Sequence, residues 1–200
     1  MNQIHPPALT QAHEQAFLAA RTYARFLDRA VPAALLQHVC ELAQWGPTSM
    51  NTQPARYVFV HSPEAKARLR PCLALGNVDK VDSAPVTVIV AQDTRFFEHL
   101  PSQFPHAPQA AQGFINDPAL AQSTALRNSS LQGAYLIIAA RQLGLDCGPM
   151  SGFNSTALDQ TFFPDGRYRS NFLINLGYGD RGSLRPRGPR LPFETVATLV

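Results

Sequence analysis

The sequence contains few cysteines and few charged residues for its length. Its 200 residues include 3 cysteines, Cys40, Cys72 and Cys147, which lie far apart and form no CxxC pair. An odd number at this spacing excludes a disulfide framework and a zinc site of the usual kind. Charged residues make up 16% of the chain, below the ~25% of a typical domain. This low fraction is consistent with a protein that hides part of its surface in an oligomer.

Other absences exclude several classes of protein. No run of ~18 apolar residues is present and no cationic start precedes an apolar segment, so we expect no membrane span, no signal peptide and a cytoplasmic location. The net charge is only +3, with a pI near 9.0, and no basic cluster falls on a predicted helix face, so we expect no nucleic-acid partner. The chain also lacks a Ser/His/Asp set, a metal-binding cluster, a carboxylate pair and a GxGxxG motif after a strand. We therefore predict no catalytic side chain, no metal and no Rossmann domain.

The length and the hydrophobic periodicity predict one domain over residues 1–200. A chain of this size buries roughly 70% of its unfolded surface. Helices outnumber strands in the predicted pattern, and four strand candidates fit an antiparallel α+β fold, with a central sheet flanked by helices. The expected helices cover residues 9–20, 31–45, 63–73, 119–143 and 154–163, and the clearest strands cover residues 56–61, 84–91 and 171–178.

The stretch Trp45–Pro54, with the sequence WGPTSMNTQP, is the most informative loop. Pro47 and Pro54 fix φ at two points, so the side chains between them are held in place. Such a neutral set of donors and acceptors suits the edge of a heteroaromatic ring better than a metal or a bare phosphate. A polar surface loop has the same composition, and that alternative stays open. The hydroxyl and amide side chains of the loop are Thr48, Ser49, Asn51, Thr52 and Gln53.

Two glycine-containing segments are further candidates for ligand contact. Cys147–Phe153, with the sequence CGPMSGF, has two glycines that let the backbone approach a ligand closely. An expected turn at residues 76–80 contains Asn77 and Lys80, which suit a ring edge and an anion. A solvated turn without a ligand is the alternative. No activating partner is visible for Cys147, so we expect a small buried thiol there and not a nucleophile.

Arginines gather near both ends of the chain. Arg21 and Arg25 flank Thr22 and Tyr23, and paired guanidinium donors beside a hydroxyl suit a phosphate. Taken alone, the first region is explained more simply as a solvated helix end, and the second has the alternative of a solvated basic loop. The C-terminal group consists of Arg181, Arg185, Arg187 and Arg190.

Residues 100–118 are rich in proline, and we expect them to form a long loop that covers the site and shapes substrate choice. The helix expected at 119–143 is apolar all round in its second half, which predicts full burial. The polar run RNSS at 127–130 interrupts its apolar pattern and faces either a site, an interface or solvent. Candidates for a substrate-shaping role in or beside the long loop are Phe97, Phe104, His106 and Phe114.

Five segments, spread from Arg21 to Glu194, resemble motifs of the nitroreductase family of FMN flavoproteins, in the family's order. GPTSxNxQP at residues 46–54 is similar to the family's (A/G)PSSxNxQP loop. Residues 21–26 resemble its RRSxRxF segment, with Ala24 at a usually basic position. The long helix with its Leu143-Gly-Leu ending is the third match. The fourth is GPMSGF at 148–153, which resembles the family's PxGGF with Ser151 in place of a glycine. The fifth is the RxPxE pattern at 190–194.

The resemblance implies a nitroreductase-like fold, an intertwined homodimer, and FMN that is reduced by NADH or NADPH. In that family the loop equivalent to Trp45–Pro54 lies on the flavin of the partner chain, and the C-terminal tail also lies on the partner. The cofactor carries the hydride, so no catalytic side chain is implied. Arg127 and Asn128 are candidates for the substrate site. The implied cofactor-binding residues are Arg21, Thr22, Tyr23, Pro47, Thr48, Ser49, Asn51, Gln53, Asn77, Lys80, Pro149, Met150, Ser151, Gly152, Arg187 and Arg190.

Within the family, the segments WGPTSxN, GNxxK, RNSS, GPMSGF and NxGYGD are similar to those of the malonic semialdehyde reductase branch, the RutE type of pyrimidine breakdown. The resemblance implies reduction of malonic semialdehyde to 3-hydroxypropionate, with Lys80, Arg127 or Asn128 as the anchor of the substrate carboxylate. Two alternatives stay open. One is a broad reductase of nitroaromatic compounds and quinones, and the other is a flavin-binding protein without turnover.

Overall fold

Strand β2, Val86–Asp93, lies in the middle of the fold, and every one of its residues is buried. Its sequence, VTVIVAQD, is largely apolar, as a strand that is covered on both faces requires. β2 pairs antiparallel with β1, Ala55–Val60, on one side and with β4, Tyr168–Gly177, on the other. β3, Asp146–Met150, completes a four-stranded antiparallel sheet in the order β1-β2-β4-β3.

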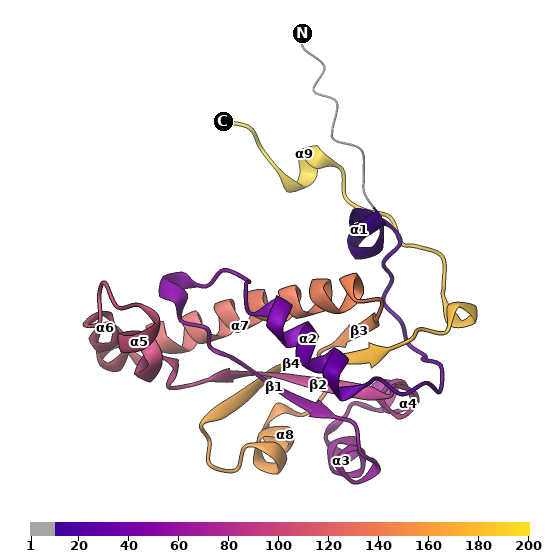
Figure 1. Ribbon diagram of the computed structural model, residues 1–200, viewed down its shortest axis with the longest axis horizontal. Helices are drawn as coiled ribbons and strands as arrows, with labels where there is room; N and C mark the ends of the chain where they lie inside the picture. Colours follow the sequence, from indigo (N-terminus) through magenta and orange to yellow (C-terminus); the bar gives the residue numbers. More distant parts are fainter. Residues whose placement is uncertain (1–10) are drawn as a thin grey trace.

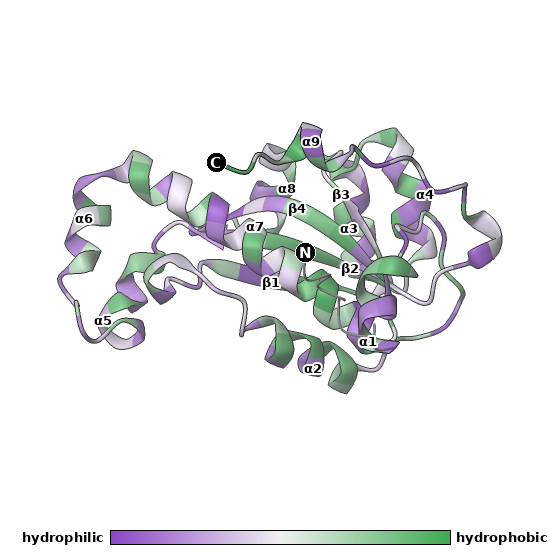
Figure 2. Cartoon of the chain, turned by 90° about the horizontal axis from the view of Figure 1, so that it is seen from above, coloured by the Kyte–Doolittle hydropathy of each residue, from purple (hydrophilic) through white to green (hydrophobic). Residues whose placement is uncertain are grey.

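The structure, a computed structural model that describes residues 11–200, has helices on both faces of this sheet (Figure 1). α2, Ala33–Ala43, and α7, Pro118–Gln142, cover one face, while α3, Pro63–Leu69, and α8, Ser155–Phe162, lie against the other. Each face has its own apolar cluster, and the middle of the sheet is strongly hydrophobic (Figure 2). The predicted α+β fold, with an antiparallel sheet flanked by helices, is confirmed.

The expected helices at 31–45, 119–143 and 154–163 are confirmed with small shifts of their ends. The last two of these helices start at capping side chains that satisfy free backbone N–H groups of the first turn. Asp117 accepts from the N–H of Leu120 at the start of α7, and Asn154 accepts from the N–H of Ala157 at the start of α8. The helix expected at 63–73 ends earlier, at Leu69, and continues as a 3-10 turn.

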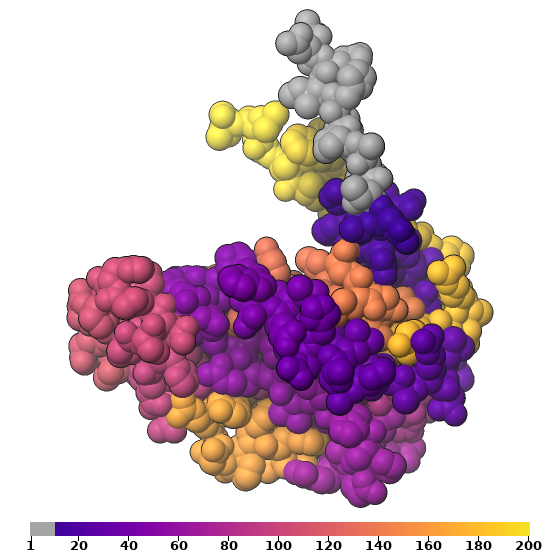
Figure 3. Space-filling view, viewed as in Figure 1, coloured from indigo at the N-terminus to yellow at the C-terminus, as the bar shows by residue number. Residues whose placement is uncertain are grey.

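Two short helices lie near the ends of the described chain. α1, Gln11–His13, continues as a π-helical turn to Leu18, while the start of the helix expected at 9–20 lies outside the described residues. α9, Phe193–Val196, belongs to a C-terminal segment that stands clear of the body of the molecule (Figure 3). Among residues 11–200, no helix combines the length and the apolar character needed to cross a bilayer.

The segment 76–80, expected as a turn, is part of a helix, α4, Leu75–Ser83. Its glycine, Gly76, lies in the first turn, where a helix tolerates glycine more easily than in its interior. Burial of Asn77 and Val81 on one face of α4 stabilises the helix despite its weak local signal. The prediction of a turn was therefore wrong, because packing outweighed local propensity.

The segment 100–118 was expected as a long loop, and that prediction was also wrong. It contains α5, Leu100–Gln103, and α6, Ala110–Asn116, which form a separate lobe at one end of the molecule (Figure 2). Its prolines lie at helix starts or between the two helices, where a missing N–H costs little. The lobe has a small core of its own, made of Phe96, Leu100, Phe114, Ala121 and Ala125.

Strand β3 falls on the segment that was expected to be a glycine-rich loop, and this is a third correction. Its outer neighbour is an irregular segment and not another strand, so Pro149 is tolerated at this edge of the sheet. Gly148 is needed there because a Cβ at this position would lie 2.4 Å from the carbonyl oxygen of Tyr23.

The second half of α7 is only partly buried in the single chain, although the sequence predicted full burial. One face packs so closely on the sheet that a Cβ at Gly133 would lie 2.4 Å from Cζ of Phe172. On the opposite face, Leu131 is 44% exposed and Tyr135 is 39% exposed. The second half of α7 therefore has two apolar faces. The sheet covers one, and the other is exposed in the single chain.

A buried carboxylate joins one end of the sheet to the lobe. Asp93, at the end of β2, is fully buried and lies 2.9 Å from Arg56, 3.1 Å from Arg167 and 3.8 Å from His99. Its other oxygen, Oδ1, accepts a hydrogen bond of 2.9 Å from the N–H of Arg95. A buried charge is stable only when it is paired and hydrogen-bonded in this way.

We predict that Asp93→Asn lowers the free energy of unfolding by about 2–3 kcal/mol, since hydrogen bonds to a buried charge are lost. The guanidinium groups of Arg56 and Arg167 then share one neutral oxygen. The control is Asp82→Asn, because the pair of Asp82 with Arg70 is exposed and contributes little. Urea unfolding measures both variants, and equal midpoints would contradict the role given to Asp93.

Candidate active site

The outer edge of β3 carries the N-terminal arginine segment. Thr22 forms a parallel bridge with Cys147, and the N–H of Tyr23 donates to the carbonyl of Cys147 at 3.0 Å. Phe26 continues the contact through an antiparallel bridge to Gly179. The segment with Arg21 is therefore fixed beside the strand and extends β3 toward the C-terminal tail.

A cavity of about 300 Å³ lies where this segment meets α7 and the tail. Arg21 donates to the carbonyl of Arg185, and Arg187 donates to the carbonyls of Leu18 at 2.7 Å and Ala20 at 2.9 Å. These bonds hold the tail over the N-terminal segment. No carboxylate lines the cavity, so its charge suits an anion. The lining residues are Phe17, Ala20, Arg21, Thr22, Arg141, Arg187, Gly188 and Arg190.

Sequence reasoning missed Arg141, which the structure adds to this cavity. It lies in the last turn of α7 and donates to the carbonyl of Ala16 at 3.2 Å. Its Nε is buried without a hydrogen-bond partner among the described residues. A basic residue ending a long helix was the available signal, but it also fits a simple interaction with the helix dipole. Arg25, by contrast, does not line the cavity.

At the other end of β3, three of the predicted residues meet. Asn77 Nδ2 donates to the carbonyl of Gly152 at 2.9 Å, and Lys80 Nζ donates to Asn77 Oδ1 at 2.9 Å. A Cβ at Gly152 would lie 2.6 Å from Asn77 Nδ2, so any larger residue there would displace this amide. Ser151 is exposed between this contact and Met150, the last residue of β3. One edge of the sheet thus carries the arginine cavity at one end and this amide–ammonium pair at the other.

The loop that starts at Pro47 has a strained backbone. Met50, Asn51 and Gln53 have φ angles of 51°, 53° and 42°, in the left-handed region that side chains other than glycine rarely adopt. The N–H of Gln53 donates to Oγ1 of Thr48 at 3.3 Å, which closes the turn. Such strain persists only where surrounding contacts fix it, and it is typical of functional loops.

The contacts that fix this loop come from α7 and from the lobe. The N–H of Ser49 donates to Oδ1 of Asn128 at 2.8 Å. Asn51 Nδ2 donates to the carbonyl of Gln103 at 3.0 Å, and Gln53 Nε2 donates to Oε1 of the same residue at 3.0 Å. Asn128 is buried with both ends of its amide engaged, since its Nδ2 donates to a carbonyl within α7. In the single chain Asn128 therefore positions the loop.

The predicted flavin ligands thus fall into two groups, the loop that Asn128 holds near the middle of α7 and the residues along the β3 edge, where Arg141 of the last turn of α7 lines the cavity. Asn128 holds the loop at residues 47–53, and Arg141 lines the arginine cavity thirteen residues later, about 20 Å along an α-helix. Arg127, next to Asn128, is exposed. The structure brings together the members of each group but keeps the groups apart.

Cys147 is not placed as a nucleophile. It is fully buried, and burial raises the pKa of its thiol to about 12. The thiolate, which is the reactive form, is therefore absent near neutral pH. Cys147 is thus the small buried thiol that the sequence predicted. Across residues 11–200, no group of three or more His, Cys, Asp or Glu side chains could hold a metal ion.

Comparison with known proteins gives one consistent answer. The sequence model of the nitroreductase family matches residues 19–178. A protein of Burkholderia lata is 56% identical over 188 residues, and the match covers 94% of this chain and 96% of that protein. A protein of Stutzerimonas stutzeri is 54% identical over 196 residues, and the match covers 98% of this chain and 100% of that protein. Both carry the provisional name NADH dehydrogenase/NAD(P)H nitroreductase. A Ralstonia pickettii relative, 53% identical over 186 residues and covering 92% of this chain and 94% of its own, has the same name with the designation HadB.

Solved structures share the fold at low sequence identity. A protein from Exiguobacterium sibiricum, provisionally described as a nitroreductase and solved with FMN, has a TM-score of 0.84 at 22% identity, covering 96% of this chain and 98% of its own. An enone reductase of gut-bacterial fatty acid saturation has a TM-score of 0.82 at 22% identity, covering 94% and 97%.

Proposed function

The chain belongs to the nitroreductase family, and on that basis we propose that it is an FMN-dependent oxidoreductase that uses NADH or NADPH. The observation that carries this proposal is the outer edge of β3. There an arginine-lined cavity and an amide–ammonium pair lie at the two ends of a strand that pairs with β4 on its inner side and with no regular strand on its outer side among residues 11–200. A ligand with a phosphate at one end and a polar ring at the other matches this arrangement.

The residues of the edge fit FMN in their chemistry. Arg21 and Arg190 would hold the phosphate, with Arg187 secondary. The guanidinium groups of Arg187 and Arg190 each donate to two backbone carbonyls, which fixes them beside the cavity. Arg141 is added to this set because its Nε is buried without a partner. Asn77 and Lys80 would bind the ring, together with Thr22, Tyr23 and the backbone of residues 149–152. Bound FMN supplies the hydride chemistry, while the chain supplies placement and charge.

The first prediction concerns this cofactor. The purified protein should be yellow and release FMN on denaturation. Arg21→Ala and Arg190→Ala should each weaken FMN binding roughly ten- to a hundred-fold, since each removes a charge-assisted contact. Arg25→Ala is the matched control, because Arg25 does not line the cavity. Titration of the apoprotein with FMN, followed by flavin fluorescence, measures the affinities. A colourless protein that takes up no FMN would refute the proposal.

We further propose that the active form is a homodimer with two sites. The loop at residues 47–53 lies too far along α7 to contact a ring bound at the β3 edge of its own chain. Its place on the partner's flavin requires two chains. Apolar side chains exposed in the single chain offer the necessary interface. They are Leu42, Trp45, Leu131 and Tyr135 beside the loop and on α7, and Leu191, Phe193 and Val196 in the tail.

A mixed dimer tests whether the site is shared. One chain carries Arg190→Ala, and the other carries Asn51→Ala with Gln53→Ala, so that each homodimer has two defective sites. If each site uses the tail arginine of one chain and the loop of the other, the mixed dimer has one intact site and recovers up to half of the parent's FMN binding. No recovery, or a monomer that retains FMN in dilute sizing runs, would contradict the shared site.

For the substrate, we propose a small carboxylated aldehyde, malonic semialdehyde, reduced to 3-hydroxypropionate as in pyrimidine degradation. The motif resemblance supports this choice, and so does the supply of cations. Arg127 is exposed beside the loop, and Lys80 stands beside the ring-binding residues. A broad nitroaromatic or quinone reductase is the alternative, since such neutral acceptors need no anchor. A flavin-binding protein without turnover is the second alternative.

Steady-state rates decide among these functions. Malonic semialdehyde should have a far higher kcat/KM than nitrofurazone or menadione. Arg127→Ala should lower kcat/KM for the acid more than for the neutral acceptors, whereas Arg70→Ala, a surface control, should change neither. Higher rates with the neutral acceptors would support the broad reductase. A flavin that NADH and NADPH do not reduce would support the binding protein.

A further inference from the structure

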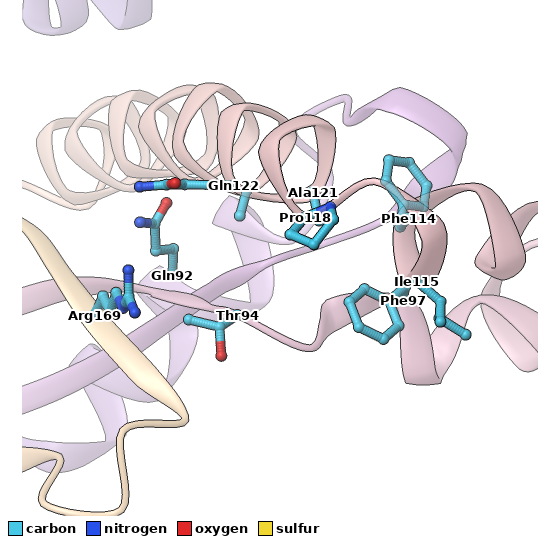
Figure 4. Close-up of a pocket in the computed structure, with 10 residues that line it drawn as sticks. Gln92, Thr94, Phe97, Phe114, Ile115, Pro118, Ala121, Gln122 and Arg169 are labelled. Atoms are coloured by element: carbon cyan, nitrogen blue, oxygen red, sulfur yellow. The ribbon is translucent and has the colours of Figure 1, made fainter.

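A second cavity, also of about 300 Å³, lies between the lobe, the start of α7 and one end of the sheet (Figure 4). None of its lining residues belongs to the β3 edge or to the loop at residues 47–53. The apolar part is made by Phe97, Phe114, Ile115, Pro118, Ala121 and Ala125, and the polar part by Gln92, Thr94, Gln122 and Arg169.

The two kinds of side chain are separated within the cavity. Figure 4 shows Gln92, Gln122 and Arg169 together at one end, with the rings of Phe97 and Phe114 at the other. A ligand that fills this space must therefore have a polar head and an apolar body. Shape and lining of this kind are typical of sites for small organic molecules.

The polar end contains hydrogen-bonding groups that the protein leaves unused. Gln92 is only 7% exposed, yet its Oε1 has no hydrogen-bond partner. Arg169 and Gln122 are exposed, and among the described residues no protein group pairs with their side chains, so both are available to a ligand. A buried polar atom without a partner destabilises the fold, so its presence in a cavity points to a ligand that completes it.

The guanidinium of Arg169 and Oε1 of Gln92 require different groups on that ligand. A guanidinium binds a carboxylate through paired N–H donors. The amide oxygen of Gln92 accepts a hydrogen bond, which an ionised carboxylate cannot donate. The head group must therefore combine an anion with a neighbouring hydroxyl or N–H.

We propose that this cavity is a binding site for a small hydroxy acid with an apolar, ring-sized body. Its carboxylate pairs with Arg169, its hydroxyl donates to Oε1 of Gln92, and its body lies against Phe97, Phe114 and Ala121. The site is separate from the proposed flavin site, and its occupancy does not depend on hydride transfer. Because its walls come from both the lobe and the sheet, a bound acid ties the two together.

The probe for this site is 2-hydroxy-3-(4-fluorophenyl)propanoate, observed by fluorine NMR with the purified, full-length protein. Its resonance should broaden saturably. Arg169→Gln should weaken binding by about tenfold or more, as expected for loss of a charge-assisted contact. Arg95→Gln is the matched control, because Arg95 is a neighbouring exposed arginine that pairs with Glu98 at 3.5 Å and does not line the cavity.

A second variant tests the hydroxyl contact. Gln92→Leu should remove the preference for the hydroxy acid over 3-(4-fluorophenyl)propanoate, which lacks the hydroxyl, and leave binding of the latter unchanged. Circular dichroism confirms that each variant is folded. If Gln92→Leu does not fold, Gln122→Leu replaces it as the variant that changes the polar end of the cavity. The proposal is overturned by a probe that does not bind at millimolar concentration, by equal binding to the Arg169→Gln and Arg95→Gln variants, or by displacement with FMN.

Discussion

The close packing of α7 against β2 and β4 determines where the candidate site residues lie. Gly133 brings the helix into contact with the ring of Phe172, and no side chain would fit in its place. With the helix fixed in this way, its middle and its last turn contact different parts of the molecule. Asn128 meets the loop at residues 47–53, and Arg141 meets the N-terminal segment. One helix therefore sets the distance between the two groups of proposed flavin ligands.

This separation explains several features that look unfavourable in a single chain. The loop holds three residues in left-handed conformations, which contacts from α7, the lobe and Arg56 of β1 fix in place. The arginine cavity gathers like charges without a carboxylate. Apolar side chains on α7 and in the tail are exposed. An anionic cofactor would offset the charge of the cavity, and a second copy of the chain would cover the exposed apolar side chains.

Several candidate site residues could be predicted from the sequence because their chemistry is local. Arginines beside a hydroxyl, or amides between two prolines, are visible as neighbours in the chain. Arg141 was missed because its relation to Arg21 exists only after α7 has packed on the sheet. The cavity around Gln92 was missed for the same reason, since its polar end joins residues from β2, α7 and β4. The predicted turn at residues 76–80 became a helix because Asn77 and Val81 are buried by neighbours that are distant in the sequence.

The sequence by itself determined the fold class, the strongly periodic helices, the buried central strand and the family. These depend on hydrophobic periodicity, capping residues and motifs, all of which act over a few neighbouring residues. Only the tertiary structure decided that β3 is an edge strand, that residues 100–118 form a lobe with a core, and that α7 leaves an apolar face open. Each of these depends on contacts between segments far apart in the chain, whose burial energy exceeds local preferences and leaves no pattern within a short stretch of sequence.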